Sequence, residues 1–64
     1  MLSIKEARTE LGMTQEQLAK EIGVTQGAVA QWEKGLTHPS FEILPKLAKT
    51  LKITLEELIV DKAG

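Results

Sequence analysis

The stretch "QEQLAKEIGVTQGAVAQWEKG", residues 15–35, decides the fold, because it describes two short helices and the turn between them. Its apolar residues follow helical spacing: Leu18, Ala19, Ile22, Val29 and Trp32. Only residues 23–25 separate the two segments, so the helices must cross sharply and need a small residue where they meet. Ala19 supplies that residue, and Gly23 supplies the unusual backbone angle. The stretch therefore predicts a helix-turn-helix, with Trp32 in the core.

The outward face of the second helix of this pair is small and polar. It consists of Thr25, Gln26, Gly27, Ala30, Gln31 and Lys34. Gly costs about 1 kcal/mol against Ala inside a helix, and a face meant only for solvent more often carries Glu and Lys. Glutamine pairs bidentately with adenine, and a threonine or alanine methyl group can touch the thymine methyl. This face predicts base contacts in a major groove from Thr25, Gln26, Gly27, Ala30 and Gln31. The alternative is that Gln26 and Gln31 are ordinary surface residues without a binding role.

Helix start and stop signals organise the rest of the chain. The sequence predicts helices over residues 3–11, 15–22, 26–34, 41–51 and 55–61, and no strand. Three capping boxes are expected, Ser3 with Glu6, Thr14 with Gln17 and Thr54 with Glu57, and two simple N-caps, Thr25 and Ser40. Pro45 leaves two alternatives: either the fourth helix is bent there, or it begins nearer Leu44. The predicted fold is all-α, a compact five-helix domain over residues 1–64, with the helix-turn-helix at about 15–34.

Composition limits the classes of function. The 64 residues suit one small domain, and 42% hydrophobic with 27% charged residues is ordinary for a globular chain. Cysteine is absent and His38 is the only histidine, so we expect no metal site, no cofactor and no enzyme. No apolar run is long enough for a membrane span, which favours a cytoplasmic protein without a membrane partner. We also expect no small-molecule ligand, since none is evident from the sequence. The net charge of −1 counts mildly against nucleic-acid binding.

At this point the chain resembles the phage repressor and Cro type of helix-turn-helix domain. The resemblance runs from Ser3 to about Val60 and is carried by "LGMTQEQLAKEIGVTQGAVAQWEKG", a following proline and "LAKTLKITLEEL". It implies a lambda-repressor-like fold and a transcriptional regulator, in the first instance a repressor, that binds a palindromic double-stranded DNA operator as a dimer. It also implies base contacts from Gln26, Gly27 and Gln31 with Thr25 at the edge, and phosphate contacts from Gln15, Lys34, Thr37 and His38.

The same resemblance implies that Arg8 and Glu33 form an ion pair between the first and third helices; the alternative is two unrelated exposed charges. In the loop "GLTHPS" after the third helix, the only basic residue is His38, whereas many members of this family are strongly basic there. The acidic balance keeps a second function open, a protein-interaction module such as an antitoxin that binds DNA only secondarily.

The last predicted helix carries more apolar residues than one face holds. We expect Leu55 and Leu58 to turn inward and Ile59 or Val60 to form a weak homodimer contact. The alternative is that all four complete the monomer core.

Overall fold

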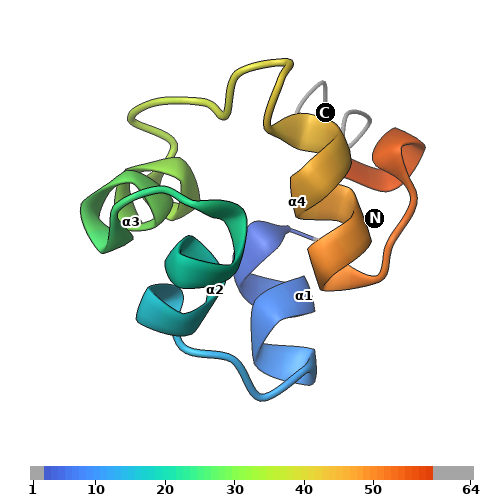
Figure 1. Ribbon diagram of the computed structural model, residues 1–64, viewed down its shortest axis with the longest axis horizontal. Coiled ribbons are helices and arrows are strands. Elements are labelled where there is room, and N and C mark those ends of the chain that lie inside the picture. The colour runs from blue at the N-terminus through green and yellow to red at the C-terminus, as the bar shows by residue number, and fades with distance from the viewer. Residues whose placement is uncertain (1–2, 59–64) are drawn as a thin grey trace.

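The computed structural model describes residues 3–58 and contains four α-helices and one further helical turn (Figure 1). The helices are α1 (Ile4–Glu10), α2 (Gln15–Ile22), α3 (Gln26–Lys34) and α4 (Leu44–Leu51). Residues 55–58 form the helical turn at the end of the described range, and no strand occurs between residues 3 and 58. The all-α fold predicted from the sequence is therefore confirmed.

Side-chain caps set the starts of α1, α2 and α3. Ser3 Oγ accepts from the Glu6 N–H at 3.1 Å and Glu6 Oε1 accepts from the Ser3 N–H at 3.0 Å. Thr14 with Gln17 repeats this reciprocal pair at α2, and Thr54 with Glu57 repeats it before the last helical turn. Thr25 caps α3 by accepting from the Ala28 N–H. The three capping boxes and the Thr25 cap are thus confirmed.

The prediction for the start of the fourth helix was wrong. Ser40 does not cap a helix: its carbonyl accepts from the N–H groups of Ile43 and Leu44, and residues 41–43 form a turn. The helix begins at Leu44 with Pro45 in its first turn, where proline's missing N–H costs no hydrogen bond. The second alternative for Pro45 is therefore confirmed. The helix ends on Lys52, a non-glycine residue in the left-handed conformation, with φ of 59°.

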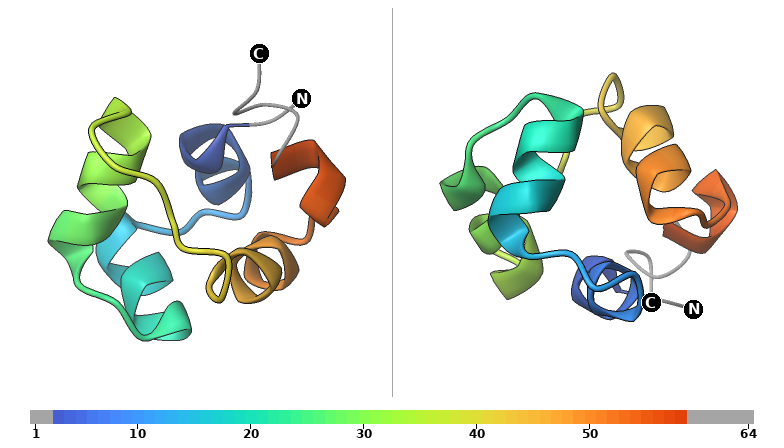
Figure 2. Two further views of the ribbon diagram at one scale, coloured as in Figure 1. Left: turned by 90° about the horizontal axis from the view of Figure 1, so that it is seen from above. Right: turned by 60° about the horizontal axis from the view of Figure 1, so that its bottom comes forward.

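The helices pack around a single core. α2 packs on α3 and α4, and α1 also packs on α3 and α4 (Figure 2). The buried apolar residues are Ile4, Ala7, Leu18, Ala19, Ile22, Val29, Trp32, Leu47, Ala48, Leu51 and Leu58. Each of the four helices contributes to this set, so α3 is held by its inner face while its outer face stays available. Trp32 lies in the core, as predicted.

The last helical turn agrees with the sequence prediction only in part. Leu58 is buried in the core, but Leu55 is 39% exposed and does not turn inward as expected. One apolar residue of this turn suffices to close the core beside α1. The expected dimer contacts, Ile59 and Val60, lie outside the described residues.

Candidate nucleic-acid interface

The turn between α2 and α3 is closed on Ala19. The N–H groups of Gly23 and Val24 both donate to the Ala19 carbonyl at 2.9 Å. Gly23 has φ of 79°, a left-handed conformation in which most side chains are strained. Ala19 is itself buried, and its carbonyl closes the turn between the two helices. The three-residue link thereby fixes how α3 projects from the domain.

The two faces of α3 differ sharply in exposure. Val29 and Trp32 are buried. Four residues of the small, polar outward face, called the reading face from here on, are exposed: Gln26, Gly27, Gln31 and Lys34. Thr25, at the cap, is exposed as well. Ala30 is half-buried, so its methyl group lies at the margin of this face rather than in its middle. The structure brings the two glutamine amides onto one open surface.

Gly27 has no role in the fold that explains a glycine. Its backbone is not among the positive-φ positions. A Cβ built there would meet only Thr25 Oγ1, at 4.0 Å, which is ordinary contact. Alanine fits this position, and it favours a helix by up to about 1 kcal/mol over glycine. The missing side chain on this face therefore needs an explanation outside the fold.

Arg8 and Glu33 join α1 to the end of α3. Arg8 Nε donates to Glu33 Oε2 at 2.8 Å and Nη2 donates to Oε1 at 3.2 Å, while Nη1 donates to the Met13 carbonyl at 2.7 Å. The side chains are 10% and 6% exposed. Burial alone would raise the pKa of Glu33, but the hydrogen bonds from Arg8 and Gln15 outweigh it and hold that pKa below its ordinary value. Because the guanidinium of Arg8 is engaged here, it adds no free cation to the surface.

Gln15 continues this ion pair toward the reading face. Its Nε2 donates to Glu33 Oε1 at 2.9 Å, and its Oε1 accepts from Gln26 Nε2 at 2.8 Å. Glu33, Gln15 and Gln26 thus form a continuous hydrogen-bond relay that ends at the first glutamine of α3. From the sequence, Gln15 was expected only as a phosphate contact, and this role was missed. Gln15 is eleven residues from Gln26 and precedes the turn, so only the crossing of the helices reveals the contact.

The loop after α3 carries the other predicted phosphate contacts. Thr37 and His38 are exposed, and Thr37 Oγ1 lies 3.4 Å from Gln31 Oε1. Two apolar side chains of the same loop are also open to solvent, Leu36 at 70% and Phe41 at 85%. Neither side chain was expected from the sequence to be a functional residue. An amphipathic pattern offers no signal for an apolar residue in a loop.

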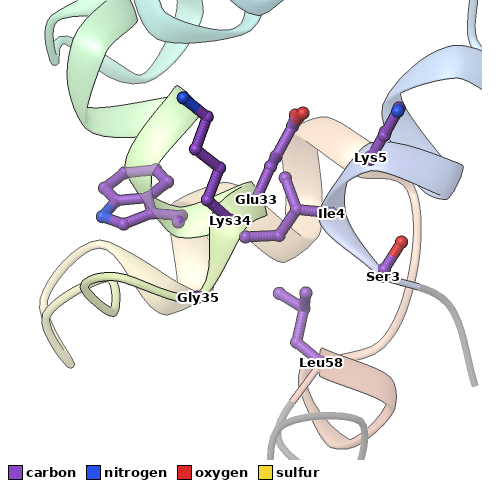
Figure 3. A pocket seen from close by; sticks show the side chains of 8 residues that line it. Ser3, Ile4, Lys5, Glu33, Lys34, Gly35 and Leu58 are labelled. Carbon is purple, nitrogen blue, oxygen red and sulfur yellow. The ribbon is translucent and has the colours of Figure 1, made fainter.

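A hollow of about 300 Å³ lies where the start of α1 meets the end of α3 (Figure 3). Ile4 and Leu58 line its apolar part. The amino groups of Lys5 and Lys34 and the carboxylate of Glu33 extend to the side away from Leu58. Between residues 3 and 58 no three His, Cys, Asp or Glu side chains cluster as metal ligands would. In the same part of the chain, the helices are too short or too polar to span a bilayer.

Comparison of the chain with known proteins identifies its family. Residues 4–58 match the model of the helix-turn-helix family. An uncharacterised helix-turn-helix-type transcriptional regulator of Methanothermobacter thermautotrophicus is 44% identical over 63 residues, 95% of this chain and 91% of the relative. The transcriptional repressor RstR of the cryptic phage CTXphi, from Vibrio cholerae, is 36% identical over 58 residues, 91% of this chain and 52% of the relative.

A third relative differs in its named effect on transcription. The transcriptional activator BcrR of Enterococcus faecalis is 36% identical over 56 residues, 88% of this chain. The chain spans 28% of that activator's length and about half of the phage repressor's. The match to the family model, over residues 4–58, includes all four helices. On this match, the chain belongs to the helix-turn-helix family of DNA-binding transcriptional regulators, of the phage repressor and Cro type.

Proposed function

We propose that α3 reads a specific operator in the major groove, with base contacts from Gln26, Gly27 and Gln31 and marginal contacts from Thr25 and Ala30. The observation that carries the proposal is Gly27, an exposed helical glycine that the fold does not require. A base edge can approach the helix backbone there only while no side chain intervenes. The neighbouring amides of Gln26 and Gln31 then supply the donors and acceptors that distinguish base pairs.

Phosphate contacts come from both ends of this surface. Gln15 lies in the first turn of α2, whose free N–H groups and positive dipole end favour an anion. Lys34, Thr37 and His38 are exposed at and beyond the end of α3. Since Arg8 is engaged with Glu33, few cations are left. We expect log K against log salt to have a slope of only about −2 to −4 per subunit.

Operator binding requires two copies. One recognition helix covers only a few base pairs, and two-fold symmetry places two such helices about 34 Å apart on one side of the duplex. We assign the homodimer contact to Ile59 and Val60 and expect it to be weak in free protein. Sedimentation with and without a palindromic operator tests this assignment. A monomer that binds the full operator in a one-to-one complex contradicts the dimer.

The regulatory role is that of a repressor in the cytoplasm, without catalytic activity, cofactor or small-molecule effector. The phage repressor among the relatives supports repression, although another relative is named an activator. A reporter gene behind the selected operator decides the direction: expression should fall when the protein is supplied.

Binding-site selection from random duplex DNA tests the proposal as a whole. The wild type should enrich one palindrome, and Gln26→Ala and Gln31→Ala should each relax the preference at a different base pair. Gly27→Ala should fold at least as stably yet bind about tenfold more weakly or worse, because its methyl group keeps the backbone from the bases. Glu10→Ala, at the exposed end of α1, is the matched control and should bind normally.

The second candidate is a protein-interaction module of the antitoxin kind. The specific observation in its favour is the exposure of Leu36 and Phe41 in one loop, since large exposed apolar side chains mark contact surfaces. The selection experiment separates the two candidates. A module that grips a protein and binds DNA only secondarily enriches no sequence.

A further inference from the structure

We propose that Leu36 packs against a sugar of the DNA backbone beside the reading face. It thereby supplies an apolar contact in a loop that is strongly basic in many members of the family. The inference rests on the proposed function, because it requires that α3 lies in the major groove.

The end of α3 fixes the backbone of Leu36 but leaves its side chain open to solvent. The Gly35 N–H donates to the Trp32 carbonyl at 3.1 Å, and the Leu36 N–H donates to the Gln31 carbonyl at 3.0 Å. In such a helix end, an apolar residue at the place of Leu36 often packs on the residue at the place of Gln31 or on the one before it. Here the first of these is a polar glutamine, and Leu36 remains 70% exposed. The fold therefore does not explain an apolar side chain at this position.

Leu36 lies beside the reading face. Its N–H is bonded to the Gln31 backbone, and Oγ1 of the following residue, Thr37, lies 3.4 Å from Gln31 Oε1. Lys34, two residues before Leu36, belongs to the reading face, and both Lys34 and Thr37 are exposed. The proposed function assigns phosphate contacts to these two residues, so Leu36 lies between two groups that reach the same backbone. The sugar is the part of that backbone that presents C–H groups, which an apolar side chain can cover.

This position favours DNA over a protein partner. Large exposed apolar side chains mark contact surfaces, and the surface that Leu36 marks adjoins the Gln31 amide. A duplex that contacts Gln31 covers the ground next to it, so DNA reaches Leu36 in the same step. A protein bound to Leu36 would instead compete with the operator. We therefore assign Leu36 to the DNA backbone.

An apolar contact differs from an ionic contact in its response to salt. A cation that neutralises a phosphate releases counterions and adds about −0.9 to the slope of log K against log salt. Burial of apolar surface releases no counterions, so it strengthens binding without changing this slope. Contacts to the sugar carry no direct sequence information, so Leu36 should strengthen binding to every duplex by a similar factor.

Anisotropy titrations with half-site duplexes test the contact, because a half-site binds one copy and leaves any dimer contact out. Leu36→Ser should weaken binding by about fivefold at every salt concentration. The factor should be the same for half-sites of selected and of random sequence. Leu36→Met keeps the apolar bulk and should bind as the wild type does. Leu36→Lys places a cation at the backbone and should steepen the slope by about 1.

Leu55→Ser is the matched control, since it makes the same substitution at another exposed leucine. Leu55 is 39% exposed in the last helical turn, which lies across the domain from α3 (Figure 1 and Figure 2). This variant should bind the half-site as the wild type does. Thermal melts monitor the fold of each variant. If Leu36→Ser does not fold, the slope measured for Leu36→Lys decides.

The failures are distinguishable. A wild type that enriches no DNA sequence overturns both the proposed function and this inference. If the wild type enriches an operator, three results overturn the inference alone: unchanged half-site binding by folded Leu36→Ser, an equal loss in Leu55→Ser, or an unchanged slope in Leu36→Lys. A loss confined to the full operator assigns Leu36 to a contact with a second copy and overturns the DNA contact.

Discussion

The helices α2, α3 and α4 have similar lengths, but the ends of α2 and α3 are fixed in a different way from the ends of α4. α2 and α3 begin at threonine caps and end at glycines with positive φ. α4 follows Ile43, whose side chain makes no capping hydrogen bond, and is ended by Lys52. α4 nevertheless buries Leu47, Ala48 and Leu51 as completely as α2 buries its own apolar residues. Local hydrogen bonds therefore define where α2 and α3 begin and end, whereas α4 is defined by its packing in the core.

The largest effect should come from removing that packing. Leu47 is fully buried in α4, and Leu47→Ala leaves a cavity as well as losing apolar contact. We expect the free energy of unfolding to fall by about 3 kcal/mol, a large share of the stability of so small a domain. Urea denaturation measures it, with Lys49→Ala on the exposed face of α4 as control. A loss below about 1 kcal/mol would mean that α4 is not held by its core contacts.

The next effect concerns the ion pair that joins α3 to α1. Glu33→Gln leaves the buried guanidinium of Arg8 without a counter-charge, and should cost about 3 kcal/mol or somewhat less at neutral pH. Glu10→Gln removes a charge at the exposed end of α1 and controls for charge alone.

The same pair should make stability depend on pH. A carboxyl whose pKa is lowered in the folded state stabilises fully above its unfolded pKa of about 4.3, and this contribution is lost as the pH falls through the folded value. Glu6 and Glu57 act in the same direction, because hydrogen bonds from the Ser3 and Thr54 backbone lower their pKa values. Urea titrations between pH 7 and pH 3 should show a shallower decline for Glu33→Gln than for wild type. Equal declines would show that the ion pair does not contribute.

The helix ends provide a prediction with opposite signs. Gly23→Ala should lower the free energy of unfolding by about 1–2 kcal/mol, because φ of 79° disfavours a Cβ although the space around it is open. Lys52 has the same kind of backbone with a side chain already present, so Lys52→Gly should raise stability by up to about 1 kcal/mol. Thermal denaturation of both variants checks the pair. A destabilised Lys52→Gly would show that this side chain contributes more than its backbone strain costs.

The difference between α2 and α3 on one side and α4 on the other explains which helix ends could be predicted from the sequence. The bounds of α2 and α3 were predicted residue by residue, since Thr14, Gly23, Thr25 and Gly35 act within one turn of their own positions. The range 41–51 starts α4 three residues early, because Ser40 looks like a cap. The alternative start nearer Leu44, which Pro45 indicated, is the one observed. Lys52 at a left-handed end gave no signal, as its residue type does not favour that conformation.

The candidate site divides in the same way. The exposed Gln26, Gly27 and Gln31 follow from helical spacing once the buried face of α3 is known. The relay does not, because Gln15 and Gln26 meet only through the angle at which α2 crosses α3. Exposure of Leu55 was also missed, since spacing cannot tell how many apolar residues a core accepts.

The smallest expected effect on stability distinguishes Thr25, which caps a helix, from Ser40, which does not. Thr25 Oγ1 accepts from the Ala28 N–H at 3.1 Å, so Thr25→Ala leaves a helix N–H without its partner and should cost about 1 kcal/mol. Ser40 contributes only its backbone carbonyl to the turn before α4, and any residue supplies that carbonyl. Ser40→Ala should therefore stay within about 0.5 kcal/mol of wild type. Urea denaturation of the two variants side by side resolves the difference. Equal costs would show that Ser40 does cap α4 in solution, and the contrast between the two regions would then lie in packing alone.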